Sequence, residues 1–187
     1  MEVQQRMRNH EVTKKQPLLR PDGYLSEPGW ARSQVWEYKR HDIQSLDLRI
    51  KEWDYYLVMG EGFGTAFTIS DNGYIGLQSV SFLDFSKPME QTKTILTPFP
   101  MGKLNMPENS SSGDCEFSNN QLHIKFTVKD GKRRIQCKCK DFYNGKPFSC
   151  DISLEQPRMD TMVIATPWEG SKAFYYNQKI VGFKAKG

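Results

Sequence analysis

Residues 122–140 alternate between apolar and polar side chains, and this pattern constrains the fold more than any other feature of the chain. Side chains in a strand point to opposite faces with a period of two, so one face collects the apolar residues Leu122, Ile124, Phe126 and Val128. Asp130-Gly131 then predicts a tight hairpin turn, because such turns need positive φ. The return strand has Ile135, Cys137 and Cys139 on its apolar face. We therefore expect an antiparallel hairpin with one buried and one solvated face.

The same alternation recurs along most of the chain. Further strands are expected over residues 48–59, 66–69, 74–85, 92–97, 148–154, 162–165 and 174–176. Turn signals such as Asp71-Asn72-Gly73 and Asn144-Gly145 separate several of these runs, and no window shows a long helical apolar stripe. Only a short helix near residues 29–35 is expected. The sequence predicts an all-β fold, an antiparallel meander that forms either a barrel or a β-sandwich.

Length and charge predict how the chain is divided. A chain of 187 residues fits one domain with its own core. The net charge is +4, but residues 1–20 hold five basic and two acidic residues, which leaves the remainder nearly neutral. We expect residues 1–20 to be a disordered basic tail and residues 21–187 to form the β domain. Nucleic acid is not an expected partner, because the basic residues do not form a stripe on the fold.

The cysteines and the remaining motifs indicate no cofactor and no metal. Cys115, Cys137, Cys139 and Cys150 contain no Cys-x-x-Cys pair, so we expect reduced, buried thiols rather than a zinc site. The glycine-rich run at residues 60–64 lacks the helix and the acidic residue of a nucleotide-binding loop. No secretory core or membrane-length apolar run is present, so we expect a cytoplasmic protein without an integral membrane segment.

Carboxylates in or beside apolar strands are the catalytic candidates. If residues 48–59 are extended, Glu52 and Asp54 share one face, and Trp53 lies on the other. An inward carboxylate face would raise one pKa and create an acid–base candidate. We favour the alternative, in which the Trp53 face is inward and the carboxylates are solvated, because buried unpaired carboxylates are rare. Asp84 poses the same question, since it shares a face with Val80 and Phe82.

An apolar, proline-rich loop over residues 97–104 is the ligand-binding candidate. A loop of this kind can rim the mouth of a barrel and contact a ligand, or it can cover one end of the core. With the aromatic residues of the first long strand, it gives the ligand-binding candidates Trp53, Tyr56, Phe99, Met101 and Lys103.

Several motifs in one order resemble a known family. They are Pro28-Gly29-Trp30-Ala31-Arg32, Tyr38 with Arg40, residues 49–56, 66–74, 79–85 and 98–107. Together they resemble the bacterial family catalogued as domain of unknown function 2804, from about Leu18 to the end of the chain. More loosely, that family is similar to two-barrel, lipocalin-like or calycin-like proteins that include relatives of carotenoid hydratases.

The resemblance implies a fold and no activity. It implies a lipocalin/calycin-like barrel or sandwich, and on this resemblance we expect the chain to be either complete or the first half of a longer two-barrel protein. A strand over residues 174–181 would then leave an open sheet edge, through which we expect association with another chain.

Three functions remain open from the sequence. The first is a module that binds an apolar small molecule. The second is an enzyme, a hydratase or isomerase on an apolar substrate, acting through Glu52, Asp54 or Asp84. The third is a structural or interaction domain that needs a partner half.

Overall fold

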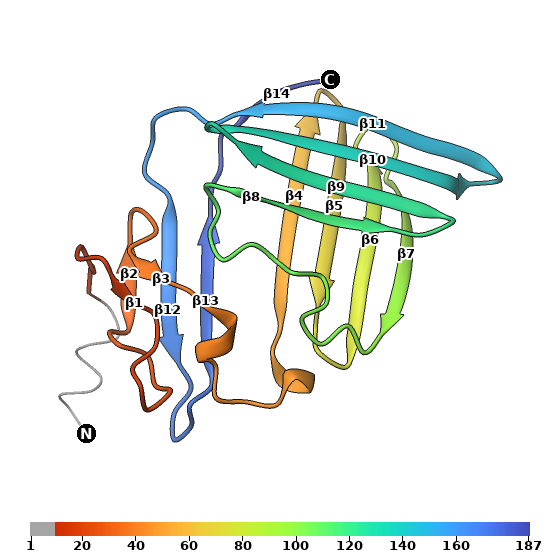
Figure 1. Cartoon of the computed structure of the whole chain (residues 1–187). Coiled ribbons are helices and arrows are strands. Elements are labelled where there is room, and N and C mark those ends of the chain that lie inside the picture. The colour runs from red at the N-terminus through yellow and green to blue at the C-terminus, as the bar shows by residue number, and fades with distance from the viewer. Residues whose placement is uncertain (1–9) are drawn as a thin grey trace. The chain divides into compact units, whose positions relative to one another are not determined.

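The computed structural model describes residues 10–187 and confirms the all-β prediction (Figure 1). The strands are β1 (Gln16–Pro17), β2 (Gly29–Ala31), β3 (Trp36–Glu37), β4 (Glu52–Gly60), β5 (Phe63–Asp71), β6 (Ile75–Asp84), β7 (Met89–Pro98), β8 (Gly113–Ser118), β9 (Leu122–Lys129), β10 (Lys132–Tyr143), β11 (Lys146–Glu155), β12 (Met162–Pro167), β13 (Phe174–Lys179) and β14 (Lys184–Lys186). Two short 3₁₀ helices, η1 (Arg40–Asp42) and η2 (Asp47–Arg49), precede β4. All strand pairs in the described sheets are antiparallel except β1 with β3. Within residues 10–187, no helix is long and apolar enough to cross a membrane.

The described part of the chain divides into two compact units. The first unit takes the described residues up to Gln44, with Glu108–Ser110 and Gln156–Phe183. The second takes Ser45–Pro107, Ser111–Glu155 and Lys184–Gly187. Because each unit gathers segments that are distant along the chain, sequence order shows no boundary between them.

The first unit contains a three-stranded sheet, β13-β12-β2, and the β1–β3 pair. Its core is formed by Val12, Leu18, Leu19, Leu25, Ala31, Val35, Trp36, Val163 and Ala165. Trp36 is fully buried, donates its indole N–H to the Glu27 carbonyl at 3.1 Å, and meets the Tyr176 ring edge-on. β13 is an edge strand, since it pairs with β12 alone. Association through that edge remains a prediction.

The first unit differs from the sequence expectations in two segments. Residues 10–20 were expected in a disordered tail, yet Val12, Leu18 and Leu19 are buried there and β1 pairs with β3. The rest of that tail, residues 1–9, lies outside the described residues. The helix expected near residues 29–35 is wrong, because residues 29–31 form β2, which pairs with β12, and residues 32–35 are not helical.

The second unit is a sandwich of two open sheets. The four-stranded sheet has the order β4-β5-β6-β7, and consecutive hairpins join its strands. The five-stranded sheet has the order β14-β11-β10-β9-β8. In Figure 1 the strands of the five-stranded sheet cross those of the four-stranded sheet rather than running alongside them. Both described sheets keep two edges, so the sandwich alternative fits and a closed barrel does not.

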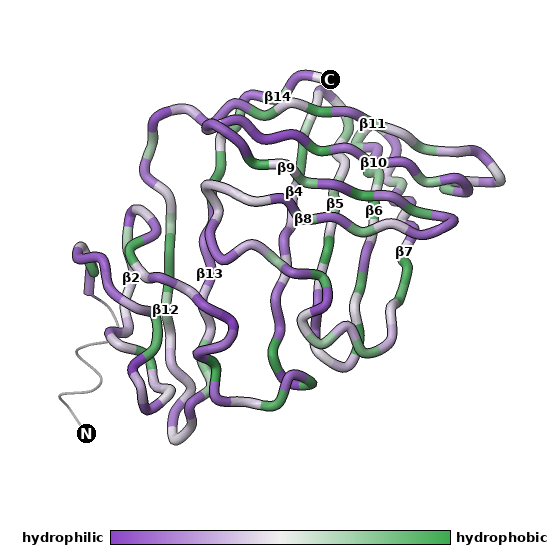
Figure 2. The backbone as a smooth tube through the Cα atoms, viewed as in Figure 1, coloured by the Kyte–Doolittle hydropathy of each residue, from purple (hydrophilic) through white to green (hydrophobic). Residues whose placement is uncertain are grey.

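The inward faces of the two sheets form one core. The four-stranded sheet contributes Phe67, Ile69 and Val80, and the five-stranded sheet contributes Ile124, Phe126 and Ile135, each no more than 1% exposed. Burying each such side chain contributes about 1.5–3 kcal/mol to stability. The expected alternation along β9 and β10 can be followed in Figure 2. Cys115, Cys137 and Cys139 are buried free thiols, and Cys150 is half-buried and also free.

Candidate functional site

The inner face of β4 carries two carboxylates. Tyr56 is buried, while Glu52, Asp54 and Val58 are half-buried on the same face of the strand. The opposite face, which begins with Trp53, is exposed. The favoured prediction, with the Trp53 face inward, is therefore wrong. The alternative, in which the face with Glu52 and Asp54 points inward, is the arrangement observed.

Arg133 of β10 supplies the positive charge that this inward face needs. Its side chain is 7% exposed, and its guanidinium Nη1 donates to the Tyr56 hydroxyl at 3.2 Å. Its charge also acts on the carboxylate of Asp54. A buried cation from the facing sheet thus reduces the cost of burying an acidic strand face. The sequence argument treated Asp54 as unpaired, because the Arg133 charge that acts on it comes from another strand.

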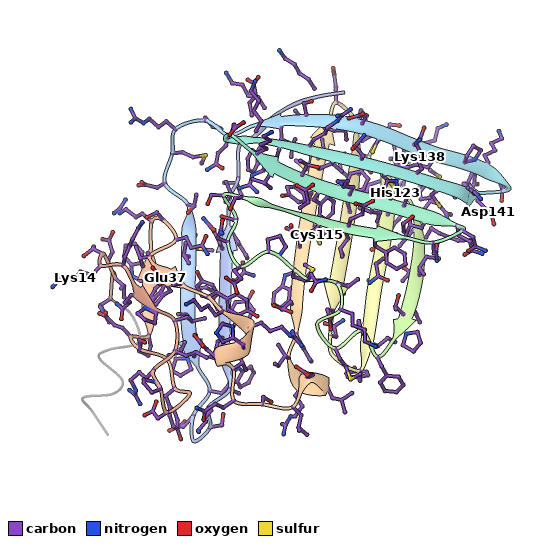
Figure 3. The ribbon with its side chains drawn as sticks, viewed as in Figure 1. Lys14, Glu37, Cys115, His123, Lys138 and Asp141 are labelled. Atoms are coloured by element: carbon purple, nitrogen blue, oxygen red, sulfur yellow. The ribbon has the colours of Figure 1, made fainter. Side chains whose placement is uncertain are left out.

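Burial governs the electrostatics of this cluster of Asp54, Tyr56 and Arg133. Loss of hydration raises the pKa of Asp54, and the attraction of Arg133 and a backbone N–H at Tyr55 oppose that rise. Burial and the neighbouring Asp54 charge raise the pKa of the Tyr56 hydroxyl to about 12. The Cys115 thiol of β8 (Figure 3) has its pKa raised to about 12, first by burial and then by Asp54 and Glu52. The thiol and the phenol therefore stay protonated at neutral pH.

A pocket opens between the two sheets, farther along β4. Its volume is ≈ 350 Å³. The four-stranded sheet and its β4–β5 turn contribute Val58, Met59, Gly60, Phe63, Thr65 and Phe82. The other wall comes from β11 and β14 and contains Phe148, Ser149, Cys150, Ile152, Ala185, Lys186 and Gly187. The rings of Phe63, Phe82 and Phe148, with the side chains of Val58 and Ile152, make the lining as a whole mostly apolar. The Thr65 hydroxyl donates to the Ser81 carbonyl at 2.9 Å.

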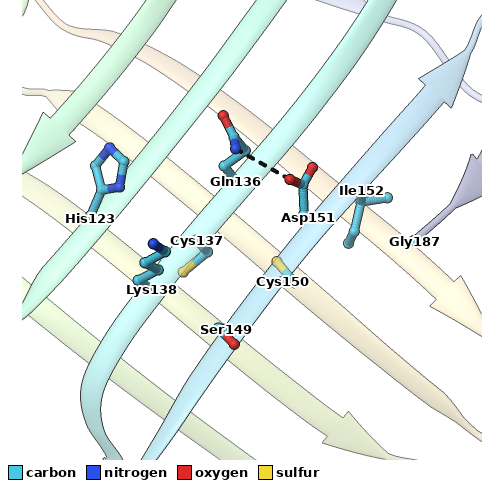
Figure 4. Close-up of a pocket in the computed structure, with 9 residues that line it drawn as sticks. All are labelled: His123, Gln136, Cys137, Lys138, Ser149, Cys150, Asp151, Ile152 and Gly187. Carbon is cyan, nitrogen blue, oxygen red and sulfur yellow. Dashed lines mark hydrogen bonds between the residues drawn. The ribbon is translucent and has the colours of Figure 1, made fainter.

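A second concavity, of ≈ 650 Å³, lies on the five-stranded sheet and includes polar residues of its outer face. Figure 4 shows His123, Gln136, Lys138 and Asp151 in its lining, with the hydrogen bond from Gln136 to Asp151. Three of these groups have partners across the strands: His123 bonds Glu116, and Asp151 accepts hydrogen bonds from Arg134 and Gln136. Cross-strand pairs of this kind are typical of a solvated sheet face, so the pocket between the sheets is the stronger candidate.

Asp84 lies away from the acidic face of β4. It ends β6, and its Oδ1 accepts hydrogen bonds from the backbone N–H groups of Ser86 and Lys87 and from the Ser86 hydroxyl. These bonds hold the pKa of Asp84 below its usual value, with the Ser86 hydroxyl as the largest cause. The structure thus gives Asp84 a turn-forming role between β6 and β7.

The proline-rich loop closes the opposite end of the four-stranded sheet from the pocket. Buried Asp71 accepts hydrogen bonds from the N–H of Gly73 at 2.9 Å and of Gly102 at 2.6 Å, which anchors the loop to the β5–β6 turn. Phe99 and Lys103 are exposed and Met101 is half-buried. The structure therefore does not bring these three ligand candidates to the pocket, and it places Trp53 on the outer face.

Sequence reasoning missed Arg133, although a signal for it was present. Arg133 has the same strand parity as Ile135, Cys137 and Cys139, which the alternation assigned to the buried face. Sequence reasoning also missed the pocket residues Phe63, Phe82 and Phe148. They lie on three different strands, and only the packing of the sheets brings them together. Among residues 10–187, no group of three or more His, Cys, Asp or Glu side chains is arranged to hold a metal ion.

Comparison with known proteins identifies the family. The family model described as "Domain of unknown function (DUF2804)" matches residues 9–187. No curated protein and no solved structure gives a significant match. The match covers nearly the whole chain, including both compact units. The chain therefore belongs to the DUF2804 family.

Proposed function

We propose that this protein binds a small apolar molecule in the pocket between the two sheets of its second unit. The observation that carries the proposal is the apolar opening beside Phe63, Phe82 and Phe148 in a sandwich whose centre is otherwise closely packed. Its volume of ≈ 350 Å³ lies at the lower end of the range of ligand sites in proteins, about 300–1,000 Å³.

The lining favours an apolar ligand with one polar end. Thr65 already donates its hydroxyl to the Ser81 carbonyl, so the wall from the four-stranded sheet offers little hydrogen bonding. Lys186 is the one charged side chain in the lining, and it is exposed. The apolar body of such a ligand would fill the space among the phenylalanine rings, and its polar end would lie at the solvent-exposed mouth of the pocket, on the side of β14.

The test is saturable binding of an anionic apolar fluorophore, 8-anilinonaphthalene-1-sulfonate, to the chain. We expect one bound probe per chain, displaced by a medium-chain fatty acid more readily than by the alcohol of equal length. Val58→Trp fills the pocket and should abolish binding. The matched control is Leu57→Trp, since Leu57 is the preceding residue of β4 and points to the outer face. Unchanged binding in the Val58 variant, or equal loss in both, would refute the pocket.

Acid–base chemistry at Asp54 is a second candidate function. Its support is the half-buried Asp54 carboxyl, whose pKa is raised by loss of hydration and which feels the charge of Arg133. A carboxyl with a raised pKa suits the proton transfers of a hydratase or isomerase. Carbon-13 NMR titration of the aspartate carboxyls tests this candidate. An Asp54 midpoint at the ordinary value of about 4 would remove its basis.

A further inference from the structure

The face of the four-stranded sheet that points away from the five-stranded sheet is almost free of charge. Four residues of β4 and four of β5 point outward, and with their partners on β6 and β7 they form four registered rows across the sheet. The rows are Trp53-Ser70-Leu77-Leu96, Tyr55-Thr68-Ser79-Thr94, Leu57-Ala66-Ser81-Thr92 and Met59-Gly64-Leu83-Glu90. Among these sixteen residues, Glu90 is the only one with a charged side chain.

The outer face of the five-stranded sheet shows what a solvated face of this protein looks like. It carries Asp114, Glu116, His123, Lys125, Arg134, Lys138 and Asp151, and several of these form ion pairs across the strands. The same unit therefore has one sheet face covered in charge and one nearly without it. A nearly uncharged face fits contact with protein rather than with water.

The relief of the uncharged face is self-complementary. β4 carries a ridge of large side chains that are well exposed: Trp53 43%, Tyr55 52%, Leu57 47% and Met59 67%. Beside it, β5 and β6 form a floor of small residues, chiefly Ala66, Thr68, Ser79 and Ser81. Phe85 closes one end, because its ring lies over Gly64, where a Cβ would be 3.1 Å from it. A two-fold axis parallel to the strands would seat each copy's ridge over the other copy's floor.

The exposed area is large enough for such a contact. The ridge, Phe85 and Leu96 together present roughly 700 Å² of surface, whereas the largest apolar patch on a typical monomer measures about 300–600 Å². A standard interface buries about 800 Å² on each partner. The near absence of charge also means that two identical faces can meet without repulsion, and it offers nothing to attract a charged partner.

We propose that this face, defined by the four rows above and Phe85, is the interface of a symmetric dimer of this chain. Sedimentation velocity of the full chain across the micromolar range is the test. We expect a concentration-dependent species of twice 21.7 kDa. Leu57→Glu and, independently, Met59→Glu place a carboxylate on the ridge and should each weaken dimerisation by about 30-fold or more.

The matched control is Ser153→Glu, which adds the same charge to an exposed position of β11 and should leave the dimer intact. Circular dichroism melts verify that all variants are folded. A wild-type chain that stays monomeric would overturn the proposal, and its flotation with phosphatidylcholine vesicles would identify a lipid surface as the occupant instead. A dimer that neither ridge variant weakens more than the control would also overturn it.

Discussion

The guanidinium of Arg133 donates a hydrogen bond of 3.2 Å to the hydroxyl of Tyr56, and the bond joins the middle strand of one sheet to an edge strand of the other. The two residues are 77 positions apart in the chain. Only the packing of the two sheets brings them together, and the same packing places Asp54 within the influence of the Arg133 charge.

Replacing Arg133 should destabilise the sandwich. Arg133→Met removes the buried cation, so the Tyr56 hydroxyl loses its donor and Asp54 loses its opposing charge. We expect a loss of about 2–4 kcal/mol in the free energy of unfolding at neutral pH, measured by urea denaturation. Arg134→Met is the control, because Arg134 is exposed and pairs with Asp151 on the outer face. It should cost less than about 1 kcal/mol. Equal losses in the two variants would contradict the buried role of Arg133.

The half-buried Asp54 carboxyl should make stability depend on acid pH. Because burial raises its pKa in the folded state, the folded protein binds this proton more tightly than the unfolded chain does. Its contribution is fully present below the ordinary pKa of 3.8 and is lost as pH rises through the raised folded value. Relative to Asp54→Asn, the wild type should therefore lose stability as pH rises across that window. The free energy of unfolding is measured against pH for both proteins, and subtracting one curve from the other cancels the contributions of the other titrating groups. A difference that stays constant with pH would count against a raised pKa for Asp54.

Gly73 should tolerate no side chain. Its φ is +77°, and a Cβ there would collide with the backbone carbonyl of Leu48 in η2. Gly62 has nearly the same φ, +78°, but nothing lies within 4 Å of its Cβ position. Gly62→Ala should cost about 1 kcal/mol of backbone strain, and Gly73→Ala should cost at least about 2 kcal/mol more. Thermal unfolding of both variants measures the difference, which would vanish if the collision were relieved without cost.

The cysteines should react slowly with thiol reagents in the folded protein. Burial raises the pKa of Cys115 to about 12 and of Cys150 to about 11, and it also raises the pKa of Cys137 and Cys139. Since the thiolate is the reactive form, maleimide labelling at pH 8 should be about 100-fold slower than in denaturant. Mass spectrometry after unfolding should find four labels. Two labels would instead indicate a disulfide, with Cys137 and Cys150 the registered pair to test first.

The positions of the longer strands could be predicted from the sequence, because alternation and turn residues depend only on neighbouring residues. Alternation and Asp-Gly or Asn-Gly turns predicted β9, β10 and β11, and the structure has these hairpins in register. Strands of two or three residues, such as β1, β3 and β14, were not predicted because they are too short to show a period. The all-β class and the family thus followed from the sequence, while the division into two units did not.

The sequence by itself determined which residues of each strand share a face, since side chains alternate along any extended chain. It did not determine which face of β4 is buried, because both faces carry apolar residues and the deciding group, Arg133, lies on the opposite sheet. The tertiary structure made that choice by setting a buried cation against the carboxylates. It also left Trp53, Tyr55 and Leu57 exposed, although the sequence argument had placed these side chains in the core.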